Sequence, residues 1–169
     1  IIFFLMGQKA NPIDLRRGVT TGWPSRWFSG HRDYAKKLLQ DIKIRKFLHA
    51  KLKDASISEI EIERDGTHTS IRISSSKPGV IIGRSGTAID DLKKVLDRKF
   101  SGHFDLSIKE IKNPDLDAAI LADSVAFQLE RRIAFRRAAK SAIRKAMESG
   151  AKGVKIAVGG RLGGADIAR

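Results

Sequence analysis

Hydrophobic and polar residues alternate with two different periods along this chain, and the changes of period mark its elements. From Tyr34 to Lys53, apolar residues recur every three or four positions, which predicts helix. From Ile57 to Arg64, isoleucines alternate with glutamates, which predicts a half-buried strand. Asp65-Gly66 then predicts a turn, and the alternating residues Ile71 and Ile73 predict the returning strand.

A short glycine motif follows this pair of strands. The apolar run Val80–Ile82 ends in a Gly-x-x-Gly motif, which consists of Gly83, Arg84, Ser85 and Gly86. Two glycines at this spacing let the backbone turn tightly, and the N–H groups that follow them lie at the start of a helix. Arg84 adds a cation, Ser85 adds a donor, and no acidic residue lies between Pro78 and Ile89. The motif predicts a phosphate-binding turn, and an ordinary glycine-rich turn between helices is the alternative.

Two nucleotide-binding motifs are excluded by spacing. A P-loop requires a lysine after its last glycine, whereas Thr87 follows Gly86. A Rossmann turn requires Gly-x-Gly-x-x-Gly directly after a strand, and Gly79, Gly83 and Gly86 are spaced differently. We therefore expect no cofactor and no small-molecule substrate.

The elements after the turn define the fold class. From Ile89 to Leu96 the apolar residues recur at spacings of three and four, which predicts a helix that Gly102 closes. Phe104, Leu106 and Ile108 alternate with polar residues as a third strand. This order of elements is α+β. Together with residues 80–86 it resembles a type II KH domain, which is a three-stranded sheet with helices whose Gly-x-x-Gly turn clamps the backbone of single-stranded nucleotides.

A second helical region begins after the break at Asn113–Asp115. No Gly or Pro occurs from Asp115 to Ser149, and the apolar stripe shifts near Ala134, which predicts two helices or one sharply bent helix. Cations gather on its second half; they are Arg131, Arg132, Arg136, Arg137, Lys140 and Arg144. Only Glu130 and Glu148 accompany them, so ion pairing within the helix does not account for the pattern. The stripe predicts contact with nucleic acid, and a solvated charged face is the alternative.

The two ends of the chain are less regular. The stretch before Trp23 is punctuated by Gly and Pro and is expected to stay extended. Its tryptophans are expected to pin it onto the protein surface, with stacking on bases as the alternative. At the other end Val154–Val158 predicts a strand that has no partner within its own half. Further strands are therefore expected beyond this chain.

These patterns divide the chain into three parts. We expect an N-terminal arm over residues 1–33, with residues 1–5 upstream of the true start at Met6. The KH domain is expected over residues 34–112, and an incomplete α/β domain over residues 113–169.

Composition narrows the class of partner. The 33 lysines and arginines exceed the 19 acidic residues and give a formal charge of +14, which favours a nucleic-acid partner. No run approaches the roughly 18 apolar residues of a membrane span, so we expect no membrane partner. Cysteine is absent, which excludes disulfides and thiolate metal sites and fits a reducing compartment.

Seven ordered blocks are similar to the bacterial ribosomal protein S-three family of the small subunit. They are residues 6–9, 62–64, 78–83, 128–132, 135–138, 150–153 and 160–165. The resemblance implies a cytoplasmic protein of the ribosomal small-subunit head that binds ribosomal RNA and neighbours other small-subunit proteins. It also implies that the protein contacts messenger RNA where that RNA enters the subunit, and that this chain is a C-terminally truncated copy.

The resemblance implies roles for particular cations as well. It places Arg136, Arg137 and Lys140 at the opening for messenger RNA, where they are expected to help unwind structured messages. We further expect Lys9 and Arg16 of the arm, and Arg161 of the C-terminal glycine-rich turn, to bind RNA.

Two other classes of function compete with this one. A free-standing KH-type protein that binds single-stranded RNA is the alternative to a ribosomal protein. An enzyme is disfavoured, because the four histidines lie in different predicted elements and no His-Glu-x-x-His motif or nucleophile elbow occurs.

Overall fold

The computed structural model describes residues 10–66, 68–100 and 102–164. In chain order the elements are α1 (Pro12–Arg16), β1 (Ser25–Arg26), α2 (His31–Lys51), η1 (Lys53–Ala55), β2 (Ile57–Asp65), β3 (His68–Ser75), α3 (Pro78–Ile82), η2 (Arg84–Gly86), α4 (Thr87–Lys99), β4 (His103–Glu110), η3 (Pro114–Leu116), α5 (Ala118–Glu130) and α6 (Phe135–Glu148). The η elements are single turns of 3-10 helix. The α+β class predicted from the sequence is confirmed.

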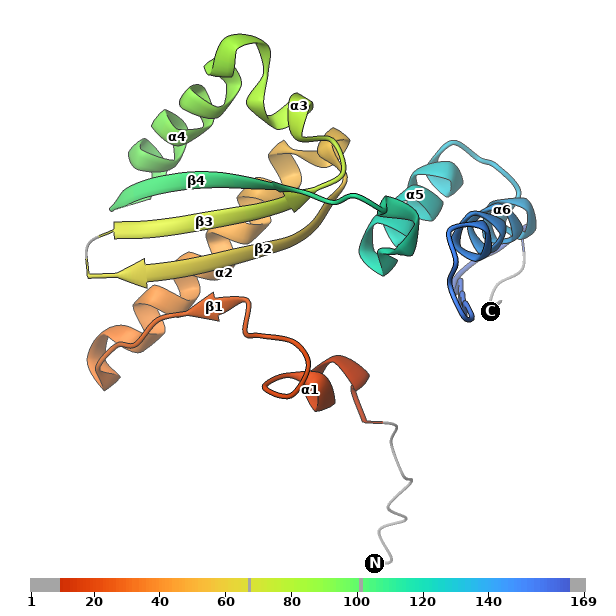
Figure 1. Ribbon diagram of the computed structural model, residues 1–169, viewed down its shortest axis with the longest axis horizontal. Coiled ribbons are helices and arrows are strands. Elements are labelled where there is room, and N and C mark those ends of the chain that lie inside the picture. The colour runs from red at the N-terminus through yellow and green to blue at the C-terminus, as the bar shows by residue number, and fades with distance from the viewer. Residues whose placement is uncertain (1–9, 67, 101, 165–169) are drawn as a thin grey trace, which may run out of the picture.

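The strands form one sheet in the order β1-β2-β3-β4 (Figure 1). β2 and β3 pair antiparallel, with Ile62 opposite Ile71, as the predicted turn at Asp65-Gly66 requires. β4 joins β3 in parallel, with Ile108 opposite Ile73. α3 and α4 lie between these two parallel strands in sequence and form the crossover between them. The sheet thus carries the glycine motif in the connection from β3 to β4.

One face of the sheet is covered by α2, α3 and α4. Buried and exposed side chains alternate along β3, and this explains why one face is covered: Ile71 and Ile73 are fully buried while the neighbouring Ser70 is exposed. The buried core consists of Ile44, Leu48, Ala55, Ile57, Ile60, Ile62, Ile71, Ile73, Ile81, Leu92, Leu96, Phe100 and Phe104. Because α3 and α4 contribute to this core, the turn between them is held on a rigid base.

The N-terminal arm is not extended throughout, which corrects the sequence-based expectation. Asn11 caps α1 by accepting a hydrogen bond from the Ile13 amide at 3.0 Å, and Pro12 stands in the first turn, where its missing N–H costs nothing. The arm then adds β1 to the sheet in parallel with β2, so the predicted three strands have a short fourth neighbour. The Ile62 amide donates to the Pro24 carbonyl at 2.8 Å at this edge.

A fully buried carboxylate fastens the arm to the domain. Asp41 of α2 accepts hydrogen bonds from the Ser25 hydroxyl at 3.1 Å and from the Trp27 indole N–H at 2.7 Å. Its other oxygen accepts from Arg64 Nε at 3.0 Å and Nη2 at 2.5 Å. The prediction that tryptophan pins the arm is thus confirmed for Trp27, whereas Trp23 remains 58% exposed.

Arg45, one helical turn after Asp41, secures the same edge. Its Nη2 donates to the Pro24 carbonyl at 2.7 Å and to Ser25 Oγ at 2.8 Å. Burial lowers the pKa of the Arg45 guanidinium from its ordinary value, and the nearby carboxylates of Asp41 and Glu59 oppose that shift. Two adjacent turns of α2 therefore hold the backbone and side chains of β1.

The C-terminal half contains two helices, as predicted. α5 ends at Glu130 and α6 starts at Phe135; between them Arg132 adopts a left-handed conformation with φ 61°. Val125 of α5 packs against Ala138 and Ala142 of α6 in a small second core. Asp117 links this half to the sheet, because it caps α5 and accepts a hydrogen bond from the Ser58 hydroxyl of β2.

The strand predicted at Val154–Val158 does not form, which corrects the sequence-based prediction. The segment forms no ladder with another strand of the described chain, and its Ile156 and Val158 pack half-buried against α5 and α6. The physical reason is that a strand requires a hydrogen-bonded neighbour, whereas its apolar side chains require only a surface to cover.

Substitution of Asp41 by Asn should destabilise the domain. The change leaves the buried Arg64 guanidinium, whose side chain is 8% exposed, without a countercharge, so we expect the free energy of unfolding to fall by about 3 kcal/mol. Urea denaturation followed by circular dichroism measures this. Asp97→Asn on the exposed side of α4 is the control and should change stability by less than about 0.5 kcal/mol. Equal effects of the two variants would contradict the assigned role of Asp41.

Candidate nucleic-acid interface

The Gly-x-x-Gly turn starts at Gly83, which adopts a conformation open only to glycine. Its φ of 71° and ψ of −174° lie in a region that residues with a Cβ do not populate. A Cβ placed there would lie 2.6 Å from the Cβ of Ala88, the second residue of α4. The first glycine therefore allows α3 to end directly against the start of α4.

The second glycine sets the direction of α4. Gly86 is left-handed, with φ 80° and ψ 1°, and no side chain caps α4 at its N-terminus. The Thr87 amide donates to the Arg84 carbonyl, and no side chain covers the positive end of the α4 dipole. Arg84 is exposed beside that end, and the first acidic residue of α4 is Asp90. The side chain of Ser85 lies outside the part of the chain that the structure describes.

Two apolar side chains adjoin the turn, and the sequence analysis did not single them out. Val80 is 52% exposed and Ile82 is 39% exposed, whereas Ile81 between them is buried. The signal was present in the sequence, because a single helical turn can bury only one side of a run of three apolar residues. These side chains place an apolar surface next to the cationic turn, which suits the unstacked bases of a single strand.

An ion pair holds α4 against β4. Lys93 Nζ lies 2.8 Å from Asp105 Oδ1. This hydrogen bond raises the pKa of Lys93 and lowers the pKa of Asp105 from their ordinary values. Both side chains are largely solvent-exposed, so the pair orients α4 more than it stabilises the domain.

The predicted basic stripe lies on the surface of α6 and of the turn before it. Ala138, Ala142 and Ala146 are buried on the opposite side of α6. The cations that face solvent are Arg131, Arg132, Arg136, Arg137, Lys140 and Arg144. Small buried alanines bring the α6 backbone close to α5, so the long cationic side chains stand out from a fixed helix.

Few protein groups neutralise this stripe. Within the described residues, none of its six cations forms an ion pair with a carboxylate. The Arg131 guanidinium lies 4.1 Å from the centre of the Phe127 ring, and that of Arg136 lies 5.6 Å from the centre of the Phe135 ring. Such stacking orients a guanidinium without neutralising its charge. The arrangement suits phosphate groups that arrive from outside the chain.

The remaining predicted RNA contacts lie outside the turn and outside α6. Arg16 is exposed on α1, and Arg161 is exposed in the C-terminal segment. Lys9 lies outside the described residues. The turn between α3 and α4 and the stripe on α6 are also well separated (Figure 1). The structure therefore presents several separate cationic surfaces rather than one pocket.

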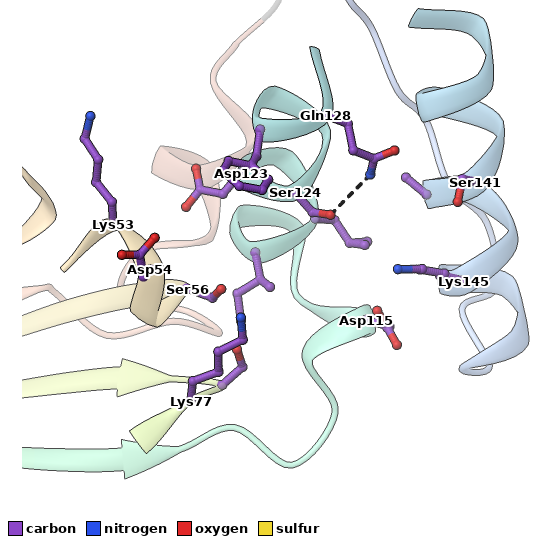
Figure 2. Close-up of a pocket in the computed structure, with 15 residues that line it drawn as sticks. Lys53, Asp54, Ser56, Lys77, Asp115, Asp123, Ser124, Gln128, Ser141 and Lys145 are labelled. Atoms are coloured by element: carbon purple, nitrogen blue, oxygen red, sulfur yellow. Dashed lines mark hydrogen bonds between the residues drawn. The ribbon is translucent and has the colours of Figure 1, made fainter. Parts of the chain in front are cut away.

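A cavity of about 340 Å³ with a mixed polar and apolar lining lies between the two halves (Figure 2). Its labelled lining residues come from η1, the approach to α3, η3, α5 and α6; they are Lys53, Asp54, Ser56, Lys77, Asp115, Asp123, Ser124, Gln128, Ser141 and Lys145. Lysines and aspartates balance each other here, and none of the predicted site residues is among them. The cavity is thus a mixed-charge junction, unlike the cationic surfaces.

Two other kinds of feature are absent from the described residues. No helix there is long and apolar enough to cross a membrane. No group of three or more His, Cys, Asp or Glu residues comes together in an arrangement that would hold a metal ion.

Helices on one face of a sheet, with a Gly-x-x-Gly turn between two of them, define the KH class of RNA-binding domain. The family model described as "KH domain" matches residues 43–116, which includes this turn. A second family model, described as "Ribosomal protein S3, C-terminal domain", matches residues 125–169.

Curated relatives extend the similarity to nearly the whole chain. A protein of Shouchella clausii named "Small ribosomal subunit protein uS3" is 51% identical over 164 residues, which are 97% of this chain and 74% of the relative. Proteins of the same name from Bacillus cytotoxicus and Desulfatibacillum aliphaticivorans are 50% and 49% identical over the same length, and the matches cover 74% and 75% of them. The chain therefore belongs to the small ribosomal subunit protein uS3 family.

The two glycines of the turn should respond differently to a methyl group. Gly86→Ala should lower the free energy of unfolding by about 1 kcal/mol, because Gly86 is left-handed but nothing lies within 4 Å of the added Cβ. Gly83→Ala should cost about 1–3 kcal/mol more, because it adds the collision with Ala88. Urea denaturation of both variants tests this order, and equal losses would refute the close approach of α3 and α4.

Proposed function

We propose that this chain is an RNA-binding constituent of the small ribosomal subunit, where it binds ribosomal RNA, contacts neighbouring subunit proteins and meets messenger RNA at the opening where that RNA enters. The observation that carries the proposal is the pair of exposed cationic surfaces on separate rigid elements, the Gly-x-x-Gly turn and α6. The names of the curated relatives support the ribosomal setting. The chain acts by binding and positioning RNA in the cytoplasmic ribosome and catalyses no reaction.

The turn binds the RNA backbone. Gly86 lets a sugar–phosphate chain approach the protein backbone, because it has no side chain in the open space beside the turn, while Gly83 lets α3 end against α4 and so holds the turn in place. The positive end of the α4 dipole and the Arg84 guanidinium supply positive charge, and the guanidinium also supplies donors. Such contacts fix the position of a strand without reading its sequence.

The stripe on α6 holds the messenger strand. Arg136, Arg137 and Lys140 fall within one solvent-facing side of the helix, and the buried alanines hold the other side. Cations on a helix that does not move can hold phosphates of a single strand as that strand passes, so the strand is kept from re-pairing. This action needs no nucleotide hydrolysis by the chain.

The turn is tested by replacing Arg84 and Ser85 with Asp, which places two anions where phosphate is expected. Affinity for a single-stranded RNA oligonucleotide should fall by about tenfold or more, with an unchanged circular dichroism spectrum. Ser70→Asp/Arg98→Asp is the matched control, because it changes two exposed positions and gives the same change in net charge. Equal losses in both variants would mean that overall charge, rather than the turn, determines binding.

The stripe is tested by the variant Arg136→Ala/Arg137→Ala/Lys140→Ala in assembled small subunits. Assembly and translation of unstructured messages should stay near normal, while translation through a stable hairpin should slow. For the isolated chain, the dependence of log affinity for single-stranded RNA on log salt should weaken by about 2, at about 0.7 per phosphate contact.

A second triple variant separates this effect from a general loss of charge. Lys51→Ala/Lys94→Ala/Arg98→Ala removes the same number of exposed helical cations outside α6 and should leave hairpin translation unchanged. If the α6 variant failed to assemble, or slowed hairpin and unstructured messages equally, its cations would instead serve as fixed partners of ribosomal RNA. Failure of the unmodified chain to co-sediment with small subunits would favour a free-standing KH-type RNA-binding protein.

A further inference from the structure

Helix α2 has apolar side chains on two opposite sides, and the fold of this chain uses only one of them. Ile44 and Leu48 are fully buried against the sheet. At 100° per residue, Leu38, Leu39 and Ile42 project from the other side of the helix. Their side chains are 39%, 56% and 40% exposed, so they form an outer apolar stripe that no other element of the described chain covers.

An open groove adjoins this stripe. It has a volume of about 590 Å³, lies between α2 and the C-terminal end of α4, and has Leu39 and Phe100 as its apolar lining. Its charged lining consists of Lys36, Lys37, Lys43 and Lys99. No carboxylate among the described residues lines the groove. An apolar surface with a purely cationic border results.

The rest of α2 strengthens this charge. Arg32 and Lys46 are exposed on the same helix, all of whose residues are described. Its two carboxylates are Asp33, at the N-terminal end, and Asp41, which is buried and bonded to Arg64. Lys99 lies 4.4 Å from the centre of the Phe47 ring, which holds its ammonium group at the border of the groove.

The combination of stripe and border favours one kind of occupant. RNA phosphates would pair with the lysines but would leave the leucines and the isoleucine without apolar contact. The exposed aromatic ring next to the stripe is that of Tyr34, and it already packs against Trp27, with ring centroids 5.3 Å apart. A second copy of this chain is disfavoured by its formal charge of +14. A protein segment with apolar residues along one side and carboxylates on both flanks satisfies both features.

We propose that the outer stripe of α2 and the adjoining groove form a docking surface for an acidic, amphipathic segment of another protein. Given the proposed ribosomal role, on which this inference rests, that protein is a neighbour in the small subunit. Apolar residues of the segment cover Leu38, Leu39 and Ile42, and its carboxylates pair with Lys36, Lys43 and Lys99. The surface lies on α2, apart from the turn and from α6, so the chain can hold RNA and this protein together.

A photo-crosslinking experiment tests the proposal. A benzophenone-bearing amino acid replaces Leu39 in the full chain, which is assembled into bacterial small subunits that lack the endogenous counterpart. After irradiation, mass spectrometry identifies the adduct. The expected adduct is a protein segment that contains both carboxylates and apolar residues. Leu38→Gln/Ile42→Gln should lower its yield by about tenfold, because glutamine keeps the helix propensity but removes apolar contact. Lys36→Glu/Lys43→Glu should lower the yield by at least about tenfold through charge reversal.

A matched probe separates failure of this inference from failure of the proposed function. The same photoreactive residue in place of Val80, which is similarly exposed beside the Gly-x-x-Gly turn, should give an RNA adduct. If the chain co-sediments and the Val80 probe reaches RNA, an adduct of the Leu39 probe with RNA, with the chain's own N-terminus or with a second copy would overturn the docking surface. The absence of any adduct would also overturn it. If the chain does not co-sediment with small subunits, the ribosomal role itself is wrong. The proposal that the partner is a neighbouring protein of the small subunit is then wrong as well.

Discussion

The buried carboxylate of Asp41 is the interaction on which the arrangement of the KH half depends. A carboxylate removed from water is costly unless donors saturate it, and here Ser25, Trp27 and Arg64 supply four hydrogen bonds. These donors come from the arm and from β2, while Asp41 belongs to α2. One charge therefore fixes the arm, the sheet edge and the helix relative to one another, and it does so only when all three are in place.

The two proposed RNA surfaces reach RNA in opposite ways, one through the main chain and the other through long side chains. At the turn, RNA has to reach the main chain, so Gly86 leaves the corner without a side chain, and Gly83 lets α3 and α4 meet closely enough to hold that corner rigid. On α6 the backbone is saturated by the helix, so long cationic side chains have to reach the RNA. The buried alanines serve that purpose indirectly, because their small size lets α6 lie close to α5.

The distribution of carboxylates keeps these surfaces cationic. On the open face of the sheet, Arg72 pairs with Glu61 at 2.7 Å, and Arg26 lies 3.6 Å from Glu63. These two glutamates are matched within the sheet, whereas within the described residues the six cations of the stripe form no ion pair with a carboxylate. Positive charge is thus concentrated where an external partner can neutralise it.

The sequence by itself determined the elements, because the period of the apolar residues follows directly from the geometry of helices and strands. It predicted β2, β3, β4, the helix after the turn, the division of the second half near Ala134, and the exposure of the α6 cations. Only the tertiary structure decided which groups meet at long range. The bonds of Asp41 with Trp27 and Arg64 span segments that no local pattern connects, and the same is true of the contact of Asp117 with Ser58. Pairing also decided the strands, since β1 forms beside β2, whereas Val154–Val158 forms none in the described chain because a strand exists only beside a hydrogen-bonded neighbour.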